Sequence, residues 1–211
     1  MRRQIGIMGG TFNPIHMGHL LLAEHAREEL QLDEILFMPS GVSYMKKQDS
    51  ILPADKRLHM VELAVGDNPF FFVSDMEIQK KGNTYTWETI EQLKESNPLC
   101  DYTFLMGADS LFHIESWKYP ERIFAACRVA VSVRESMNLP DCRKKANELQ
   151  RKYGADIVIL QTDRIDISST DIRIRRKRNR SIRYLVPEPV RQWIEEQGLY
   201  MENTENRVNL R

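Results

Sequence analysis

Short apolar runs alternate along the chain with longer segments in which apolar residues recur at spacings of three and four. The runs predict strands over residues 4–8, 34–38, 70–74, 101–106, 128–133 and 157–160. The longer segments predict amphipathic helices over residues 20–30, 54–65, 86–95, 141–153 and 187–196. Strands that alternate with helices are typical of a parallel sheet wrapped by crossover helices. We therefore expect an α/β fold with five or six parallel strands, flanking helices and a small C-terminal helical part.

Length and composition are those of an ordinary globular protein. The chain has 211 residues, of which 42% are hydrophobic and 28% charged, and its formal net charge is zero. A chain of this size removes roughly 70% of its unfolded surface from water on folding. We expect one domain over residues 1–200 and a polar tail over 201–211.

Cysteine use and the N-terminus bear on the cellular compartment. Cys100, Cys127 and Cys142 are widely spaced and form no CxxC pair, which favours neither a disulfide framework nor a zinc site. The N-terminal apolar run is too short for a signal peptide, and no run of 18 apolar residues could span a membrane. We expect a cytoplasmic protein with no membrane partner.

Ligands of parallel sheets bind beyond the carboxyl ends of the strands, so the loops to inspect are 9–19, 39–53, 75–85 and 107–119. The first loop belongs to the stretch GGTFNPIHMGHL. Gly9 and Gly10 are expected to make a tight turn that lets a ligand touch the main chain. His16 and His19 would face one anion from the first turn of a helix, whose N–H groups favour phosphate.

The same stretch allows two alternatives. Glycines after a strand are often only a turn. Two histidines three apart on a helix could also bind a metal, but no third His, Cys or carboxylate lies at a helix-compatible spacing, as zinc sites require. We favour a polyphosphate cradle and assign no metal ligands.

The stretch also resembles the GGTFDPxHxGH segment of the HxGH nucleotidyltransferase superfamily, with the signature at His16-Met17-Gly18-His19. Later segments narrow the resemblance to the bacterial nicotinate-nucleotide adenylyltransferases. They are NTYT at 83–86, GAD at 107–109 with Trp117 shortly after, ISSTDIR at 167–173 and SIRYLVP at 181–187. The signature alone is superfamily-wide, whereas the combination in this order is specific.

The resemblance implies a Rossmann-like fold and a reaction of NAD biosynthesis. ATP and nicotinate mononucleotide would give nicotinate adenine dinucleotide and pyrophosphate, with magnesium accompanying ATP. The mononucleotide phosphate would attack the α-phosphorus in line without a covalent enzyme intermediate. Catalysis would then rest on positioning and on charge stabilisation.

The resemblance also assigns residues. It implies that the catalytic residues are His16, His19 and Arg173. It implies that ATP is bound by Gly9, Gly10, Thr11, Phe12, His16, His19, Gly107, Asp109, Ser168, Ser169, Thr170 and Arg173. It implies that nicotinate mononucleotide is bound by Lys46, Thr84, Tyr85, Thr86 and Trp117.

The chemistry of these residue types agrees with the roles that the resemblance implies. A purely structural role is an alternative for several of them. Hydroxyls and a guanidinium at a helix start suit phosphates, yet the 168–173 segment could simply cap a helix with Arg173 in water. Asp109 suits ribose hydroxyls, or it could cap a helix that begins at Ser110. Trp117 could stack on a pyridine ring, or it could be a core residue.

Two positions depart from the family pattern. Met45 stands where a histidine is usual, although Lys46 beside it matches, and Asn179 stands where glycine is frequent. The run 173–183 has seven basic residues and no acidic one. Because it overlaps the phosphate motif, we interpret it as a solvated face and expect no nucleic-acid partner.

Two rival functions stay open. One is another HxGH nucleotidyltransferase, such as a nicotinamide-mononucleotide or phosphopantetheine adenylyltransferase, which would keep the histidines but not the Trp117 pocket. The other is a non-catalytic nucleotide-binding sensor. No pattern in the sequence indicates an oligomeric state.

Overall fold

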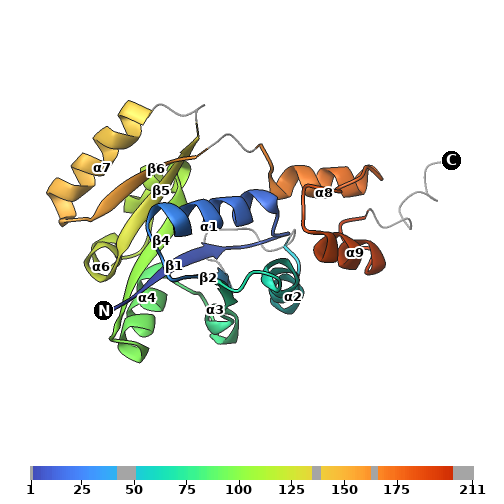
Figure 1. The fold of residues 1–211 in the computed structure, drawn as a ribbon, viewed down its shortest axis with the longest axis horizontal. Coiled ribbons are helices and arrows are strands. Elements are labelled where there is room, and N and C mark those ends of the chain that lie inside the picture. The colour runs from blue at the N-terminus through green and yellow to red at the C-terminus, as the bar shows by residue number, and fades with distance from the viewer. Residues whose placement is uncertain (1, 42–50, 135–138, 163–165, 202–211) are drawn as a thin grey trace.

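The computed structural model describes residues 2–41, 51–134, 139–162 and 166–201, which contain a six-stranded parallel sheet (Figure 1). The strand order is β3-β2-β1-β4-β5-β6, the Rossmann-like order, and every neighbouring pair is parallel. The strands are β1 (Arg3–Gly10), β2 (Glu34–Pro39), β3 (Phe71–Val73), β4 (Cys100–Gly107), β5 (Arg128–Arg134) and β6 (Ile157–Thr162). All six predicted strands and the predicted fold class are confirmed.

The longer helices also lie where the periodicity predicts them. They are α1 (Met17–Glu29), α2 (Ala54–Val65), α4 (Thr86–Ser96), α7 (Leu139–Tyr153) and α9 (Glu188–Glu196). Helix α8 (Ser169–Lys177) begins at the predicted helix start. The short elements α3 (Met76–Gln79), α5 (Ala108–His113), η2 (Ile114–Ser116) and α6 (Pro120–Ala126) were not predicted, because fewer than three turns show little apolar periodicity.

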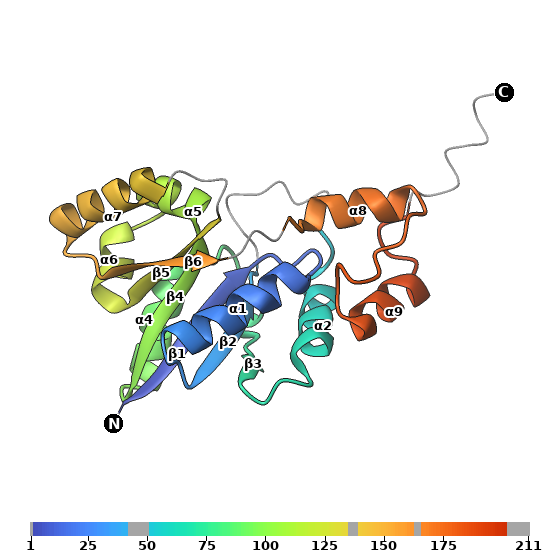
Figure 2. The same cartoon turned by 45° about the horizontal axis from the view of Figure 1, so that its top comes forward.

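The two faces of the sheet carry separate apolar cores, because alternate residues of a strand point to opposite sides. Met8 of β1 and Leu105 of β4 belong to the core that α1, α2, α8 and α9 cover. Ile7 and Phe104, one position away, belong to the core that α4, α5, α6 and α7 cover. Figure 2 shows α7 and α5 on the opposite side of the sheet from α1. This layering leaves the carboxyl edge of the strands for a site.

The glycines at the end of β1 do not form the predicted tight turn. Gly9 and Gly10 continue the strand and pair with Met38 and Pro39 of β2. The left-handed residue of this region is Phe12, with a φ of 47°. A Cβ on Gly10 would lie 3.0 Å from the Phe12 ring, so the small residue leaves room for that ring. The turn expectation is wrong because glycine also serves close packing.

The C-terminal helices pack against the same core as α1 and α2. Val190 and Ile194 of α9 are fully buried there, together with Ile172 of α8. Between these helices Asn179 adopts a φ of 53°, a left-handed conformation in which asparagine is enriched among the non-glycine residues. Of the predicted tail over 201–211, only Met201 is described.

No helix within the described ranges is long and apolar enough to cross a membrane.

Candidate active site

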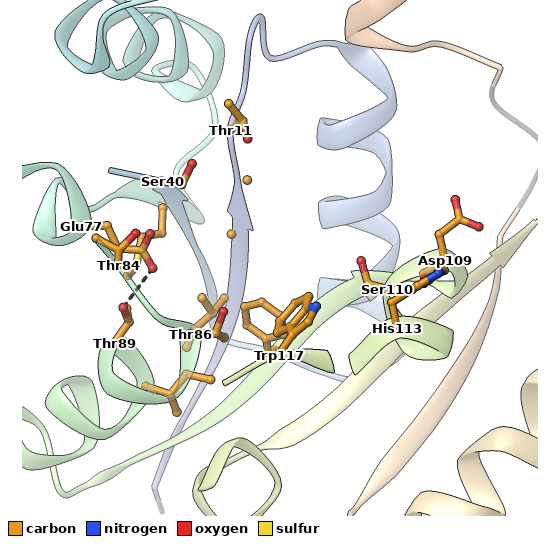
Figure 3. Close-up of a pocket in the computed structure, with 16 residues that line it drawn as sticks. Thr11, Ser40, Glu77, Thr84, Thr86, Thr89, Asp109, Ser110, His113 and Trp117 are labelled. Carbon is orange, nitrogen blue, oxygen red and sulfur yellow. Dashed lines mark hydrogen bonds between the residues drawn. The ribbon is translucent and has the colours of Figure 1, made fainter. Parts of the chain in front are cut away.

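A cavity of about 460 Å³ lies at the carboxyl edge of β1, β2 and β4 (Figure 3). Its lining comes from all four loops that the sequence singled out. The lining residues are Ile7, Gly9, Gly10, Thr11, Met38, Ser40, Glu77, Thr84, Thr86, Thr89, Ile90, Phe104, Asp109, Ser110, His113 and Trp117. This volume falls in the range of small-molecule sites.

The two signature histidines lie together at the start of α1. Their rings stack with centroids 3.7 Å apart and an interplanar angle of 24°. The main-chain N–H of His16 donates to Nδ1 of His19 (3.2 Å), and the Phe12 ring meets the His19 ring edge-on at 5.1 Å. Because Nδ1 accepts this bond, a neutral His19 carries its proton on Nε2, where it can donate to a ligand.

The start of α1 offers fewer main-chain donors than the sequence suggested. The N–H of Met17 donates to the Leu185 carbonyl (2.9 Å), and the N–H of His19 donates to the His16 carbonyl (2.9 Å). Of the first three N–H groups of the helix, Gly18 therefore supplies the one best placed for an anion. The imidazoles must carry a larger share of any phosphate contact.

The segment that joins β1 to α1, residues 11–16, is here called the histidine loop, and Arg57 of α2 fixes its first residue. Nη1 of Arg57 donates to the Thr11 carbonyl (2.8 Å), and Nη2 donates to the Ser40 carbonyl at the end of β2 (2.7 Å). Nε donates to the Leu52 carbonyl (3.0 Å). Burial lowers the pKa of Arg57, but a guanidinium stays charged in proteins. Arg57 thus links the end of β1 to the end of β2 by donating to the carbonyl groups that follow each strand.

Helix α8 fastens the next part of the histidine loop. Oγ of Ser169 donates to the Pro14 carbonyl (2.8 Å). Nη1 of Arg173 donates to the Asn13 carbonyl (2.8 Å), and its Nη2 donates to Oγ1 of Thr170 (3.2 Å). The guanidinium therefore points at the histidine loop, which disfavours the alternative that it only faces water.

Ser168 caps α8, because its Oγ accepts the main-chain N–H of Asp171 (3.1 Å). The capping role considered for this segment is therefore real for Ser168. It does not compete with a ligand role for the side chains of Thr170 and Arg173, which lie on the following turn.

Thr84 and Thr86, two of the residues predicted to bind the mononucleotide, line one wall of the cavity. Thr86 is the first residue of α4, with Tyr85 as its N-cap, so Thr84 precedes the helix rather than beginning it. The N–H groups of Glu88 and Thr89 both donate to the Tyr85 carbonyl (3.1 Å each). The helix-start donors that α4 can offer to a ligand are therefore those of Thr86 and of the residue after it.

Trp117 lines the cavity beside this helix start, between Thr86 and Ser110 in Figure 3. Its indole meets the Phe104 ring edge-on at 6.2 Å and packs against the core beneath. The two roles considered for Trp117 are compatible, since one part of the ring packs while another lines the cavity.

Asp109 lies at the other end of the cavity from Thr84 (Figure 3). It is the second residue of α5, whose N-cap is Gly107, so the alternative that Asp109 caps a helix beginning at Ser110 is wrong. A Cβ on Gly107 would meet nothing within 4 Å. Nδ1 of His113, one turn on, lies 2.8 Å from the Asp109 carbonyl.

Several lining residues were not predicted, and Glu77 is the most informative. Oγ1 of Thr89 donates to the Glu77 carboxylate (2.9 Å). Burial raises the pKa of Glu77, while hydrogen bonds from Thr89, Thr84 and the Gly41 main chain and the charge of Lys80 act in the opposite direction. The carboxylate thus links the loop after β2 to the segment before α4. The loop ranges contained Glu77, but no spacing pointed to these contacts.

Some predicted residues do not line this cavity. Tyr85 instead contacts Lys118, whose Nζ lies 4.5 Å from the ring centroid. Phe12 is buried beneath Gly10. Gly107 is also absent from the lining. His16, His19 and the α8 residues lie at the adjoining histidine loop, so the residues predicted to bind ATP occupy two neighbouring places. Lys46, like Met45, lies outside the described residues.

The described residues offer no set of side chains that could ligate a protein-bound metal. Over residues 2–41, 51–134, 139–162 and 166–201, no group of three or more His, Cys, Asp or Glu side chains could hold a metal ion.

The chain is similar to known proteins over most of its length. A family model described as cytidylyltransferase-like matches residues 7–175. A protein of Lachnoclostridium phytofermentans named probable nicotinate-nucleotide adenylyltransferase is 43% identical over 199 residues, which cover 94% of this chain and all of the relative. A protein of the same name from Exiguobacterium sibiricum is 44% identical over 197 residues, which cover 93% of this chain and 98% of the relative.

A solved structure gives the same fold. It is nicotinic acid mononucleotide adenylyltransferase of Plasmodium falciparum complexed with NaAD, with a TM-score of 0.77 at 18% identity. The match covers 94% of this chain and 97% of that one. At this identity the likeness concerns the fold.

Proposed function

This chain belongs to the cytidylyltransferase-like family, and from that premise we propose that it is a nicotinate-nucleotide adenylyltransferase. It joins ATP and nicotinate mononucleotide to form nicotinate adenine dinucleotide and pyrophosphate, a step of NAD biosynthesis. The observation that carries this proposal is the cavity that unites the Thr86 helix start and Trp117 with the glycine end of β1.

The histidine loop and α8 are suited to the triphosphate of ATP. His19 presents Nε2 as a donor because its Nδ1 accepts the His16 N–H. Arg173, held by the Asn13 carbonyl, can bring a second planar donor to the same anion. Charge develops on the phosphate oxygens as the mononucleotide attacks and pyrophosphate leaves, and preoriented donors stabilise that charge without reorganisation.

The adenosine end of ATP fits the Gly107 and Asp109 side of the cavity. Gly107 leaves open space at the end of β4, and an exposed carboxylate at Asp109 can accept hydrogen bonds from ribose hydroxyls. Gly9 and Gly10 form a floor without side chains between this end and the opposite wall.

The opposite wall fits nicotinate mononucleotide. The N–H groups at the start of α4 carry a partial positive charge, which favours the carboxylate of the pyridine ring over an uncharged amide. The Trp117 indole offers a flat face to the ring. Lys46 is assigned to the mononucleotide phosphate by its match to the family pattern.

Magnesium fits this site as a companion of ATP. No metal-binding cluster is found within the described ranges, and Mg²⁺ is commonly held by substrate phosphates and water rather than by a protein cage. When bound, the ion offsets phosphate charge. His16, His19 and Arg173 then orient the phosphates without ligating it.

Product analysis tests the proposal. The protein is incubated with magnesium and ATP plus nicotinate mononucleotide, nicotinamide mononucleotide or phosphopantetheine in separate reactions, and pyrophosphate and product mass are measured. We expect nicotinate adenine dinucleotide as the favoured product. Preferred use of phosphopantetheine would assign the chain to a rival adenylyltransferase, and no pyrophosphate with any acceptor would indicate a nucleotide-binding sensor.

A further inference from the structure

Tyr200, close to the end of the described chain, contacts the histidine loop. Its hydroxyl donates to Oδ1 of Asn13 (2.9 Å), a residue 187 positions earlier. The same Oδ1 accepts the main-chain N–H of Leu52 (3.3 Å), and the Asn13 carbonyl accepts Nη1 of Arg173 (2.8 Å). Asn13 is buried, with 5% of its surface exposed. One residue of the loop therefore joins the start of α2, helix α8 and the C-terminal segment.

The end of α9 directs Tyr200 toward this contact. The helix closes with the N–H of Gly198 donating to Glu195 (3.2 Å) and that of Leu199 donating to Ile194 (2.9 Å). Gly198 is left-handed with a φ of 58°, as the Schellman type of helix end requires. Leu199 is then buried in the core, which fixes the position of Tyr200 directly after it.

The surroundings keep the Tyr200 hydroxyl in its donor form. Burial raises the pKa of Tyr200, and the nearby cations of Arg173 and Arg57 only partly counter this effect. The phenol is therefore protonated at neutral pH and can donate to Asn13. Both cations hold carbonyl groups of the histidine loop, at Asn13 and at Thr11. The hydroxyl thus completes a set of side chains that converge on one short loop.

We propose that Tyr200 is a positioning residue for the triphosphate site: its hydrogen bond fixes Asn13, and the Asn13 carbonyl in turn orients Arg173 toward the phosphates. The identity of the nucleotide rests on the proposed function. The segment after α9 accordingly supports the ATP site through Asn13, from which Tyr200 is 187 positions away. Tyr200 acts through Arg173 and does not itself touch the substrate.

The matched pair of variants is Tyr200→Phe and Tyr184→Phe. Both tyrosines are left-handed, with φ values of 62° and 65°, but Tyr184 is 83% exposed. Each substitution removes only a hydroxyl. The loss of one neutral hydrogen bond corresponds to roughly a fivefold change in an equilibrium constant. Tyr200→Phe should therefore raise the KM for ATP about fivefold and leave that for the mononucleotide within about twofold, whereas Tyr184→Phe should change neither.

Binding of an α,β-methylene analogue of ATP, measured by calorimetry, tests the inference independently of turnover. Tyr200→Phe should weaken this binding about fivefold in the wild-type background but less than about twofold beside Arg173→Ala, because Arg173 is the route of the effect. A fivefold loss that persists beside Arg173→Ala, or equal losses for both substrates, would overturn the proposal. A protein that binds the analogue but forms no dinucleotide would refute the proposed function and still allow this comparison.

Discussion

His16 and His19 are joined by hydrogen bonds and by a ring-stacking contact at the start of α1. The main-chain N–H of His16 donates to Nδ1 of His19 at 3.2 Å, and the two rings lie 3.7 Å apart. The bond from the His16 N–H occupies Nδ1 of His19, so the proposed contact with the phosphates would be made by Nε2 as a donor. In the histidine signature, His16 therefore orients the imidazole of His19.

Replacement of His19 tests that role. His19→Ala should lower kcat by roughly 100-fold, the scale of losing one preoriented donor to a transition-state charge. Steady-state turnover with both substrates at saturation measures the effect. His59→Ala on the surface of α2, where the ring is partly exposed, is the control and should keep near-normal kcat. Unchanged turnover in a folded His19→Ala protein would remove His19 from the mechanism.

The proposed role of Arg173 should depend on the planar geometry of its guanidinium as well as on its charge. The guanidinium spans the Asn13 carbonyl and Oγ1 of Thr170, and lysine brings the same charge without the planar fork. Arg173→Lys should lower kcat/KM for ATP by about tenfold or more, and Arg173→Ala should lower it further. Arg178→Lys in the same basic run should have little effect. Similar, strongly salt-dependent losses at both positions would instead indicate a polyanion-binding surface.

The start of α4 can be tested by removing one main-chain donor. Proline is tolerated at the first helical position, and Tyr85 before it is already extended, with φ and ψ of −129° and 133°. Thr86→Pro should raise the KM for nicotinate mononucleotide by about tenfold, because the lost N–H would bind a charged group. Thr86→Ala keeps this N–H and separates the effect of the hydroxyl. An unchanged KM for the proline variant would place the carboxylate elsewhere.

Glu77 should make the stability of the protein depend on pH. Burial raises its pKa above the ordinary value of 4.5 in the folded state, so the ionised carboxylate opposes folding. The penalty is absent below the unfolded pKa and grows as the pH rises through the folded one. The melting temperature of Glu77→Gln, relative to wild type, should therefore increase between about pH 4 and pH 8. Glu95→Gln, on the exposed face of α4, is the control; an equally flat profile for both variants would contradict the assignment.

The sequence predicted the sheet well because each strand lies in a short apolar run that is recognisable along the chain. It predicted the histidine pair and Trp117 because a motif places them at fixed distances along the chain. Gly9 and Gly10 were misread as a turn, since glycine permits a turn and close packing alike. The Phe12 ring, which requires the small residue at Gly10, becomes visible only in three dimensions.

Contacts between distant segments account for most of what the sequence did not reveal. Glu77 joins Thr89 across 12 positions, and Tyr200 joins Asn13 across 187 positions. Neither pair follows a helical or strand spacing, so no periodicity can suggest it. A helix near Ser110 was only an alternative from the sequence, and the placement of Asp109 on the first turn of α5 was not predicted.

The ratio of kcat/KM for nicotinate mononucleotide to that for nicotinamide mononucleotide tests whether the cavity recognises the carboxylate of the pyridine ring. Both acceptors are compared at saturating ATP with magnesium, in the same buffer and with the same enzyme preparation. Because the start of α4 offers N–H donors and a partial positive charge to a carboxylate, we expect a ratio of about ten or more. A ratio of one or less would contradict it, since the wall formed by Thr86 and Trp117 would then not recognise the nicotinate acid group.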